Sequence, residues 1–487
     1  MKFYENSHKE KYLFLILIFF GFLFRFYDIN LDNFWIDEIF SFYIADPNID
    51  FFETWHRNRS LENTPILFNL VLKYYFKFFG YEIPIARYFP ALLNFLSILI
   101  IHKLFSKISN GKSTLLIVFL TCFNIYLIRY SQELRHYSLV FFLFAITIFY
   151  FLKIINLENQ KFSIYKIFFF TFLNFLLLLT HVFVLTIFFA YFLFSLSMFI
   201  KYKKNLLNLN LSLILIFFIS IIFLYFYVLN VAVSPGWIKP FEFKFLTNLF
   251  FSSFFGSRSV GILFLVCLVT LIIYFRKKII LKQDIYFFLF LAILSSYSIT
   301  IVYSVLISPV LIDRYLIFIL LPILLIISNF SLEIKNKLLK NLIIFILIIS
   351  TLGNFFTERS FKQFFGDKTL YKPDFLTLFK KINESEFNKF TYNFFEKSPL
   401  KSYSDKNELQ KALKNYSFKY TKVNNKKLNY INYLDKGFTN ENIEFLWIIC
   451  LKSLNGTDCS LPNKFTNSSI LNEYFFNGLN LKLIKIN

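Results

Sequence analysis

The sequence predicts a helical, multi-pass membrane protein that ends in a small α/β domain. Of its 487 residues, 57% are apolar and 17% are charged, and the mean hydropathy is +0.56. Soluble domains are about half apolar and a quarter charged. With 11 Gly, 11 Pro and four Cys, the chain is neither collagen-like nor a disulfide scaffold, and its apolar content excludes disorder over most of its length.

Apolar runs of roughly the length that crosses a bilayer as a helix occur throughout the first 355 residues. The run 164–200 is interrupted by Thr180-His181, and we interpret it as two spans folded back on each other. Eleven membrane spans are therefore predicted, at 11–27, 84–101, 113–128, 136–152, 164–180, 182–200, 211–232, 260–275, 284–307, 314–330 and 341–355.

Lys and Arg gather in alternate loops and so orient these spans. The basic residues lie near the N-terminus and in every even-numbered turn: Lys2, Lys9, Lys11, Lys103, Lys107, Lys112, Lys153, Lys161, Lys166, Lys201, Lys203, Lys204, Arg276, Lys277, Lys278, Lys282, Lys335, Lys337 and Lys340. The first odd-numbered loop, 28–83, is instead acidic. Since cytoplasmic loops are enriched in Lys and Arg, the N-terminus is predicted inside and the C-terminus outside. The net charge of +22 then reflects these loops rather than nucleic-acid binding.

The first span has a basic start and no small-residue cleavage site after it, which predicts a retained signal-anchor. The expected location is a bacterial inner membrane. The membrane domain is predicted over 1–355, with its catalytic first outer loop at 28–83, and a soluble extracytoplasmic domain over 356–487.

This C-terminal segment is rich in Lys and Asn, with short apolar stretches at Ile443–Leu451 and Leu479–Ile486. We expect a helix over Glu408–Asn415 and a buried strand over Glu444–Leu451. Cys450 and Cys459 flank a predicted turn at Asn455-Gly456, so a disulfide is expected in this oxidising location. Cys122 and Cys267 lie in spans and are interpreted as core residues.

Four polar clusters fall on the outer face under this topology. Taken singly, each has a structural explanation: a helix cap, a self-satisfied Arg–Glu cluster, a histidine at a span end, or one ion pair. Together they place carboxylates, cations and a histidine around one chamber at the membrane edge, which suits a lipid-linked, anionic substrate. The clusters are Phe34–Glu38, Arg129–Tyr137, Thr180-His181 and Asp313–Tyr315.

These residues also resemble the GT-C superfamily of polyprenyl-phosphate-sugar glycosyltransferases, in the branch of protein O-mannosyltransferases and lipid A aminoarabinose transferases. The matching motifs, in order, are Trp35-Ile36-Asp37-Glu38, a Pro-led juxtamembrane helix from Thr64-Pro65 to Phe79-Gly80, Glu82 to Arg87, Tyr130 to Tyr137, Thr180-His181 and Arg314-Tyr315. The single proline at Thr64-Pro65-Ile66, and His136 where relatives commonly carry proline, leave the subfamily and acceptor open.

The resemblance implies an inverting transfer of one sugar from a polyprenyl phosphate to a hydroxyl of a glycan, lipid or protein in the outer leaflet. It implies Asp37 as general base, supported by Glu38. Arg87, Arg135 and Arg314 would bind the donor phosphate. Glu133, His181, Tyr137 and Tyr315 would position substrate or bind a metal. A divalent cation could share this work, and the sequence leaves that point open.

Other functions make different predictions. A lipid-linked-saccharide transporter or flippase would carry charges near the middle of its spans, whereas here they lie at the outer ends. A non-catalytic assembly subunit would have no need of the Asp37-Glu38 pair. An outer-face polysaccharide polymerase would be expected to carry a large Arg-containing late loop, but 308–313 is short. The sequence contains no Gly-rich phosphate loop, Cys-x-x-Cys or His-Glu-x-x-His motif.

Overall fold

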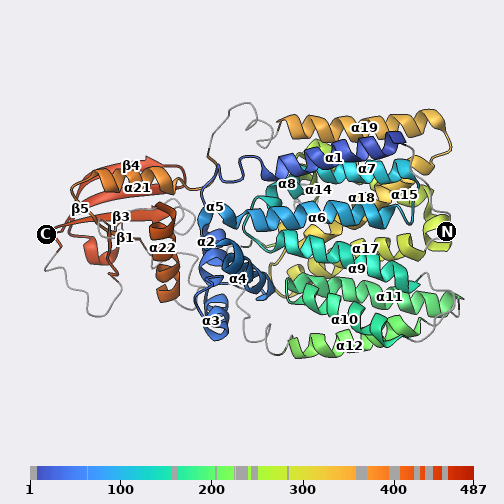
Figure 1. Ribbon diagram of the computed structural model, residues 1–487, viewed down its shortest axis with the longest axis horizontal. Coiled ribbons are helices and arrows are strands. Elements are labelled where there is room, and N and C mark those ends of the chain that lie inside the picture. Colours follow the sequence, from blue (N-terminus) through green and yellow to red (C-terminus); the bar gives the residue numbers. More distant parts are fainter. Residues whose placement is uncertain are drawn as a thin grey trace.

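Three layers follow one another along the long axis of the molecule (Figure 1): a bundle of long helices, a group of short helices, and a sheet domain. The N-terminus lies at the far end of the bundle and the C-terminus at the far end of the sheet domain. The computed structural model describes residues 8–62, 64–155, 163–202, 206–223, 225, 238, 240–242, 250–281, 284–357, 370–393, 406–421, 428–433, 443–451 and 459–486.

Each of the eleven predicted spans contains a helix of the bundle, although part of 211–232 lies outside the described residues. The helices in these spans are α1 (His8–Phe26), α6 (Tyr88–Phe105), α7 (Gly111–Cys122), α8 (Ile125–Ser131), α9 (Tyr137–Ile155), α10 (Ile164–Leu178), α11 (Leu185–Tyr202), α12 (Leu207–Phe223), α15 (Arg258–Tyr274), α17 (Asp284–Leu306), α18 (Leu320–Glu333) and α19 (Lys337–Thr357). The short helices α14 (Phe250–Phe255) and α16 (Arg276–Leu281) lie between predicted spans.

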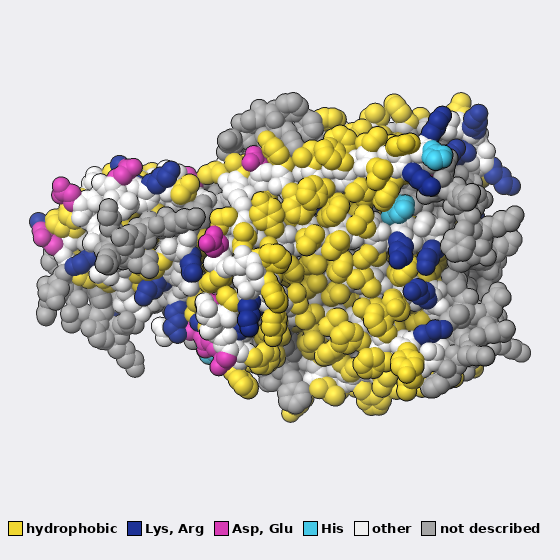
Figure 2. All heavy atoms as spheres, in the orientation of Figure 1, with side chains coloured by type: hydrophobic (Ala, Val, Ile, Leu, Met, Phe, Trp, Pro, Cys, Tyr) yellow, Lys and Arg dark blue, Asp and Glu magenta, His cyan; other side chains and the backbone are white. Residues whose placement is uncertain are grey.

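Six candidate spans in the described part of the chain are long and apolar enough to cross a membrane, or seven if the bent pair α7–α8 counts as one span. The chain is therefore a multi-pass membrane protein, while eleven crossings remain a prediction. Figure 2 shows a broad apolar belt over the bundle, with Lys and Arg side chains gathered at the end away from the sheet domain.

The third predicted span is broken rather than continuous. Helix α7 ends at Cys122, and α8 leaves it at an angle of 54°. The Asn124 side chain begins α8 by accepting a hydrogen bond from the Leu127 N–H at 2.9 Å. Buried Arg25 of α1 donates to the carbonyls of Thr121 and Cys122, at 3.0 and 3.2 Å. These bonds satisfy carbonyls that a helix end would otherwise leave unpaired in the apolar interior.

Four short helices of the first outer loop separate the bundle from the sheet domain: α2 (Ile36–Ile44), α3 (Phe51–Leu61), α4 (Leu67–Phe79) and α5 (Ile83–Ala86). Helix α4 is the Pro-led helix expected from the sequence. It ends at Gly80, whose φ of 99° is accessible to glycine at little cost. The apolar side of α4 buries Phe68, Leu72 and Phe76, which holds this layer against the rest of the molecule.

The tail forms a five-stranded sheet in the order β2-β1-β3-β5-β4. Its strands are β1 (Lys389–Tyr392), β2 (Asn429–Tyr430), β3 (Phe445–Leu451), β4 (Ser469–Phe476) and β5 (Leu479–Lys485), and its helices are α21 (Phe375–Glu384) and α22 (Lys406–Thr421). The predicted helix lies inside α22, and the predicted buried strand is β3. The central strand β3 runs parallel to β1 and antiparallel to β5.

The expected disulfide joins Cys450 to Cys459, whose Cα atoms are 5.8 Å apart. The predicted turn at Asn455-Gly456 lies outside the described residues.

Helix α22 docks the tail on the first outer loop. The Phe34 N–H donates to the Tyr416 hydroxyl at 3.1 Å, and the two rings stack with their centroids 5.7 Å apart. The Tyr43 hydroxyl donates to Glu408 at 3.0 Å. Phe34, Tyr43, Glu408 and Tyr416 are all buried, so this contact places the sheet domain directly against α2 and the residues just before it.

Candidate active site

Glu38 is the centre of a buried charge network. Its side chain is 0% exposed and forms a forked pair with Arg87, at 2.8 Å for both contacts. It also accepts from the Leu134 N–H and from Lys372 Nζ, each at 2.8 Å, and from the Trp35 N–H at 3.3 Å. Burial raises the pKa of Glu38, but the Arg87 and Lys372 charges outweigh burial and lower that pKa to about 2. Glu38 is therefore an anion at working pH, held rigidly from four sides.

Arg87 has all five of its N–H groups engaged within the protein. Besides the two bonds to Glu38, it donates to the carbonyls of Ile29, Asp32 and Asn33, at 2.7 to 3.1 Å. Its side chain is 2% exposed. The fold therefore uses Arg87 to tie the segment after α1 to the start of α2, whereas the family resemblance implies a role in binding the donor phosphate.

Asp37 has different surroundings from its neighbour. Consecutive residues on a helix point about 100° apart, so Asp37 turns away from the buried network and is 20% exposed. Its Oδ2 lies 3.7 Å from Nη2 of Arg314, whose side chain is 15% exposed. Asp37 also lies in the N-terminal turn of α2. Asp37 thus combines a carboxylate, an adjacent cation and access from outside.

Arg135 forms a buried ion pair with Glu62. It also donates to the Asp37 carbonyl and the Ser41 hydroxyl, both at 3.0 Å. One interpretation of the sequence was that the arginines of Arg129–Tyr137 pair with Glu133. That interpretation is wrong for Arg135, because the fold places Glu62 at ion-pair distance from it instead. Among the described residues, Arg135 Nε has no hydrogen-bond partner. Arg135 therefore holds the backbone of Asp37 in place.

Glu133 lies between two cations. Its carboxylate is 3.6 Å from Lys372 Nζ and 4.0 Å from Arg129 Nε. The Glu133 side chain is 7% exposed and that of Arg129 is 72% exposed. Arg129 therefore carries its charge at the rim of the site, while Glu133 lies inside it.

The aromatic and imidazole side chains form one wall beside Arg314. The ring of His181 lies 5.0 Å from that of His136 and 5.3 Å from that of Tyr315. The Arg314 guanidinium lies 6.0 Å from the rings of both Tyr137 and Tyr315. Burial, and then the charges of Arg135 and Arg314, lower the pKa of His181 to about 3, so this imidazole is neutral at working pH.

The arrangement does not fit a divalent metal centre. Among the described residues, no three His, Cys, Asp or Glu side chains lie close enough to bind one ion. Four carboxylates of the site each face a cation: Asp37 with Arg314, Glu38 with Arg87 and Lys372, Glu62 with Arg135, and Glu133 with Lys372 and Arg129. Side-chain cations thus neutralise the acids that a metal would need.

Two members of the site were not singled out from the sequence. Glu62 was counted only as one more acid of the outer loop. Lys372 is 334 residues from Glu38 in the chain and is one of many tail lysines, so no local pattern marks it. The predicted residues that the fold brings together are Asp37, Glu38, Arg87, Arg135, Arg314, Glu133, His181, Tyr137 and Tyr315.

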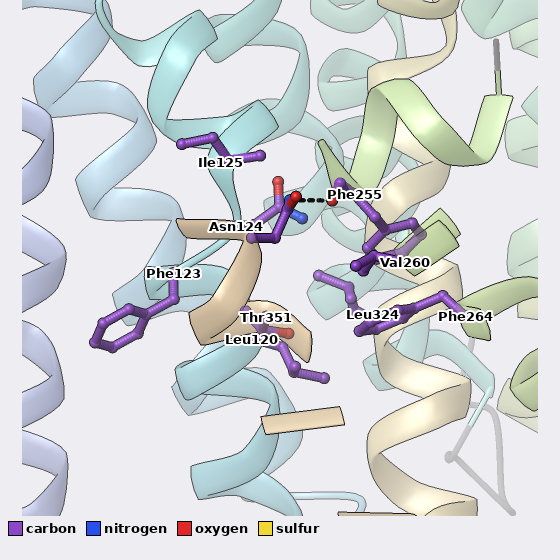
Figure 3. Close-up of a pocket in the computed structure, with 10 residues that line it drawn as sticks. Leu120, Phe123, Asn124, Ile125, Phe255, Val260, Phe264, Leu324 and Thr351 are labelled. Carbon is purple, nitrogen blue, oxygen red and sulfur yellow. Dashed lines mark hydrogen bonds between the residues drawn. The ribbon is translucent and has the colours of Figure 1, made fainter. Parts of the chain in front are cut away.

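A separate small pocket lies where α7 breaks into α8 (Figure 3). Its lining is mainly apolar and includes Phe123, Phe255 and Leu324, and it shares no residue with the charged site. The Asn124 amide donates to the Phe254 carbonyl at 3.0 Å, and the Asn354 amide donates to that of Phe255. These two amides bond backbone carbonyls beside the break between α7 and α8. We therefore take the charged site, and not this pocket, as the candidate active site.

Comparison with solved structures shows that the chain has the GT-C fold, as the sequence resemblance predicted. ArnT from Cupriavidus metallidurans matches in the apo state with a TM-score of 0.58 at 10% identity, covering 98% of both chains. Its complex with undecaprenyl phosphate matches with a TM-score of 0.57 at 9% identity, again over 98% of both chains.

The archaeal oligosaccharyltransferase AglB from Archaeoglobus fulgidus, in complex with an inhibitory peptide and a dolichol-phosphate, matches with a TM-score of 0.50 at 9% identity. That match covers 82% of this chain and 64% of AglB. A zinc and sulfate complex of the A. fulgidus oligosaccharyltransferase has a TM-score of 0.46 and is covered over 55% of its length. No protein-family model and no curated protein sequence matches the chain.

Proposed function

We propose that this protein is an inverting glycosyltransferase that moves a sugar from a polyprenyl phosphate to an acceptor hydroxyl at the outer face of a bacterial inner membrane. The observation that carries the proposal is the partly exposed carboxylate of Asp37 beside Arg314, on helix α2 between the apolar bundle and the sheet domain (Figure 1). The lipid phosphates in the ArnT and AglB structures support this donor class. The sugar and the nature of the acceptor, whether glycan, lipid or protein, are left open.

Asp37 takes the proton of the acceptor hydroxyl as its oxygen attacks the anomeric carbon. The bond from that carbon to the phosphate oxygen breaks on the opposite face, which inverts the configuration. The departing lipid phosphate gains negative charge. Arg314, 3.7 Å from Asp37 and partly exposed, is placed to stabilise that charge. Exposed Arg129 adds a cation at the rim.

The remaining charges hold this pair in place. Arg135 donates to the Asp37 carbonyl, and the Glu38–Arg87 pair anchors the next residue of the same helix turn. The rings of Trp35, Tyr137 and Tyr315 surround Arg314 and limit its movement. An arginine confined in this way meets a phosphate with little loss of side-chain entropy.

The test is the transfer of sugar by purified protein from a panel of polyprenyl-phosphate sugars. Asp37→Asn keeps the size and polarity of the side chain but removes its basicity, and we expect transfer to fall by roughly a hundredfold or more. Asp46→Asn, in the same loop but outside the charge network, is the matched control and should retain activity. Full activity in Asp37→Asn would refute the assignment of the base.

A further inference from the structure

Lys372 enters the charged site from the tail, on the segment just before α21. Its Nζ lies 2.8 Å from Glu38 and 3.6 Å from Glu133, and its side chain is 17% exposed. It is thus one cation shared between two buried carboxylates that belong to different loops of the membrane domain. It does not contact Asp37 at salt-bridge distance, so any effect on chemistry passes through Glu38 and Glu133.

The backbone around Lys372 is clamped from two directions. Asp32 of the membrane domain accepts from the N–H groups of Tyr371 and Lys372, at 3.0 and 3.4 Å. The Asn33 side chain donates to the Pro373 carbonyl at 3.1 Å. On the tail side, the Asn477 side chain donates to the Lys372 carbonyl at 3.0 Å. The lysine is therefore delivered by a fixed piece of backbone and not by a loose surface loop.

We propose that Lys372 is a positioning residue of the active site, through which the docked tail completes the charge network that orients the first turn of α2. The proposal rests on the glycosyltransferase function proposed above. Two carboxylates buried near each other repel unless a cation lies between them. Without Lys372, Glu133 keeps Arg129, which is exposed and 4.0 Å away, while Glu38 keeps Arg87.

One amide reports on this arrangement without requiring activity. The N–H of Leu134, next to Glu133, donates to Glu38 Oε1 at 2.8 Å. When the shared cation is removed, repulsion should separate the segment containing Glu133 from Glu38 and break this bond. Hydrogen exchange of the peptide covering Glu133–Arg135 therefore measures the bridge directly.

The experiment compares Lys372→Met and Lys372→Arg with the wild-type protein. We expect Lys372→Met to lower kcat by roughly tenfold to a hundredfold, because a small misplacement of the base suffices for that loss. KM for the donor should change little, exchange at 133–135 should accelerate, and Lys372→Arg should restore both. Lys381→Met is the matched control, since Lys381 lies over the Tyr474 ring within the tail. If Lys372→Met does not fold, Lys372→Gln replaces it with the same expected result.

Unaltered exchange at 133–135 in Lys372→Met would overturn the proposal. So would exchange that rises equally throughout the tail, because that indicates lost docking instead of a local effect. An equal loss of kcat in Lys381→Met would overturn it as well. A wild-type protein that transfers no sugar from any donor would refute the proposed function, whereas the exchange measurement would still decide the role of Lys372.

Discussion

At the scale of single residues, two adjacent carboxylates acquire different roles from their place on one helix turn. Glu38 turns inward and is 0% exposed against Arg87, while Asp37 turns outward and is 20% exposed beside Arg314. A buried carboxylate with four partners is held rigidly in place, and one with outside access can exchange a proton. The Asp37-Glu38 dipeptide was visible in the sequence, but which of the two carboxylates is buried depends on where α2 begins.

The lowered pKa of His181 predicts how the stability of the folded protein depends on pH. Its folded-state pKa is lowered from 6.5 to about 3. The unfolded chain therefore takes up a proton as the pH falls below 6.5 while the folded protein does not. His181 thus makes the folded protein progressively less stable between pH 6.5 and 3, by up to about 1.4 kcal/mol per pH unit.

We expect His181→Asn to reduce this acid sensitivity, because asparagine does not titrate there and its oxygen can accept the bond that the Phe183 N–H donates to His181. The measurement is the melting temperature in detergent from pH 7 to 4. An equally steep decline in the variant would show that His181 does not contribute to it.

At the scale of elements, the start of α2 is held by two junctions between helices, α5–α6 and α8–α9. Arg87 of the α5–α6 junction secures Glu38, and Arg135, between α8 and α9, secures the Asp37 carbonyl. The break between α7 and α8 redirects the chain that leads to Arg135. The candidate active site therefore lies where a bent span, a short helix and a loop meet.

Substitutions in the Arg135–Glu62 pair can distinguish a structural role of Arg135 from a role in the transfer reaction. Arg135→Met leaves Glu62 buried without its cation, which we expect to cost about 3–5 kcal/mol of stability. The double variant Arg135→Met/Glu62→Gln removes both charges and should recover most of the melting temperature. Because the support of the Asp37 carbonyl is still missing, transfer should stay low.

Recovery of both stability and transfer in the double variant would show that Arg135 acts only through its pairing with Glu62. Donor binding is measured on the same preparations. Weakened donor binding in both variants would instead indicate the phosphate-binding role that the family resemblance implies for Arg135.

At the scale of the whole molecule, the apolar belt lies between a sheet domain at one end and a concentration of Lys and Arg at the other (Figure 2). The N-terminus lies at the basic end and the C-terminus at the opposite one (Figure 1). This agrees with a chain that begins inside and ends outside. The disulfide between Cys450 and Cys459 suits an oxidising compartment.

The topology predicts that a periplasm-active reporter fused after Asn487 is active, whereas a reporter that works only in the cytoplasm is silent there. The alkylation of Cys450 and Cys459 provides an independent measurement: both should resist a thiol reagent until the protein is reduced. Activity of the cytoplasmic reporter, together with free thiols, would place the tail inside and contradict an odd number of crossings.

The sequence by itself determined the features that depend on local periodicity and composition. Apolar runs predicted where the helices lie, and short motifs predicted most of the charged site and the GT-C resemblance. The basic loops predict an orientation, which the reporter fusion tests. Strand β3 and helix α22 were predicted for the same reason, since each carries its own pattern of apolar residues.

Only the tertiary structure decided which charges pair and which remain open. Arg135 selects Glu62, 73 residues away, over Glu133 two residues away, and Lys372 reaches Glu38 across 334 residues. The strength of an ion pair depends on the distance between its charges and on how far they are shielded from water. Helix packing sets both quantities, so the partners of Glu38 and the exposure of Asp37 were not encoded in any local pattern.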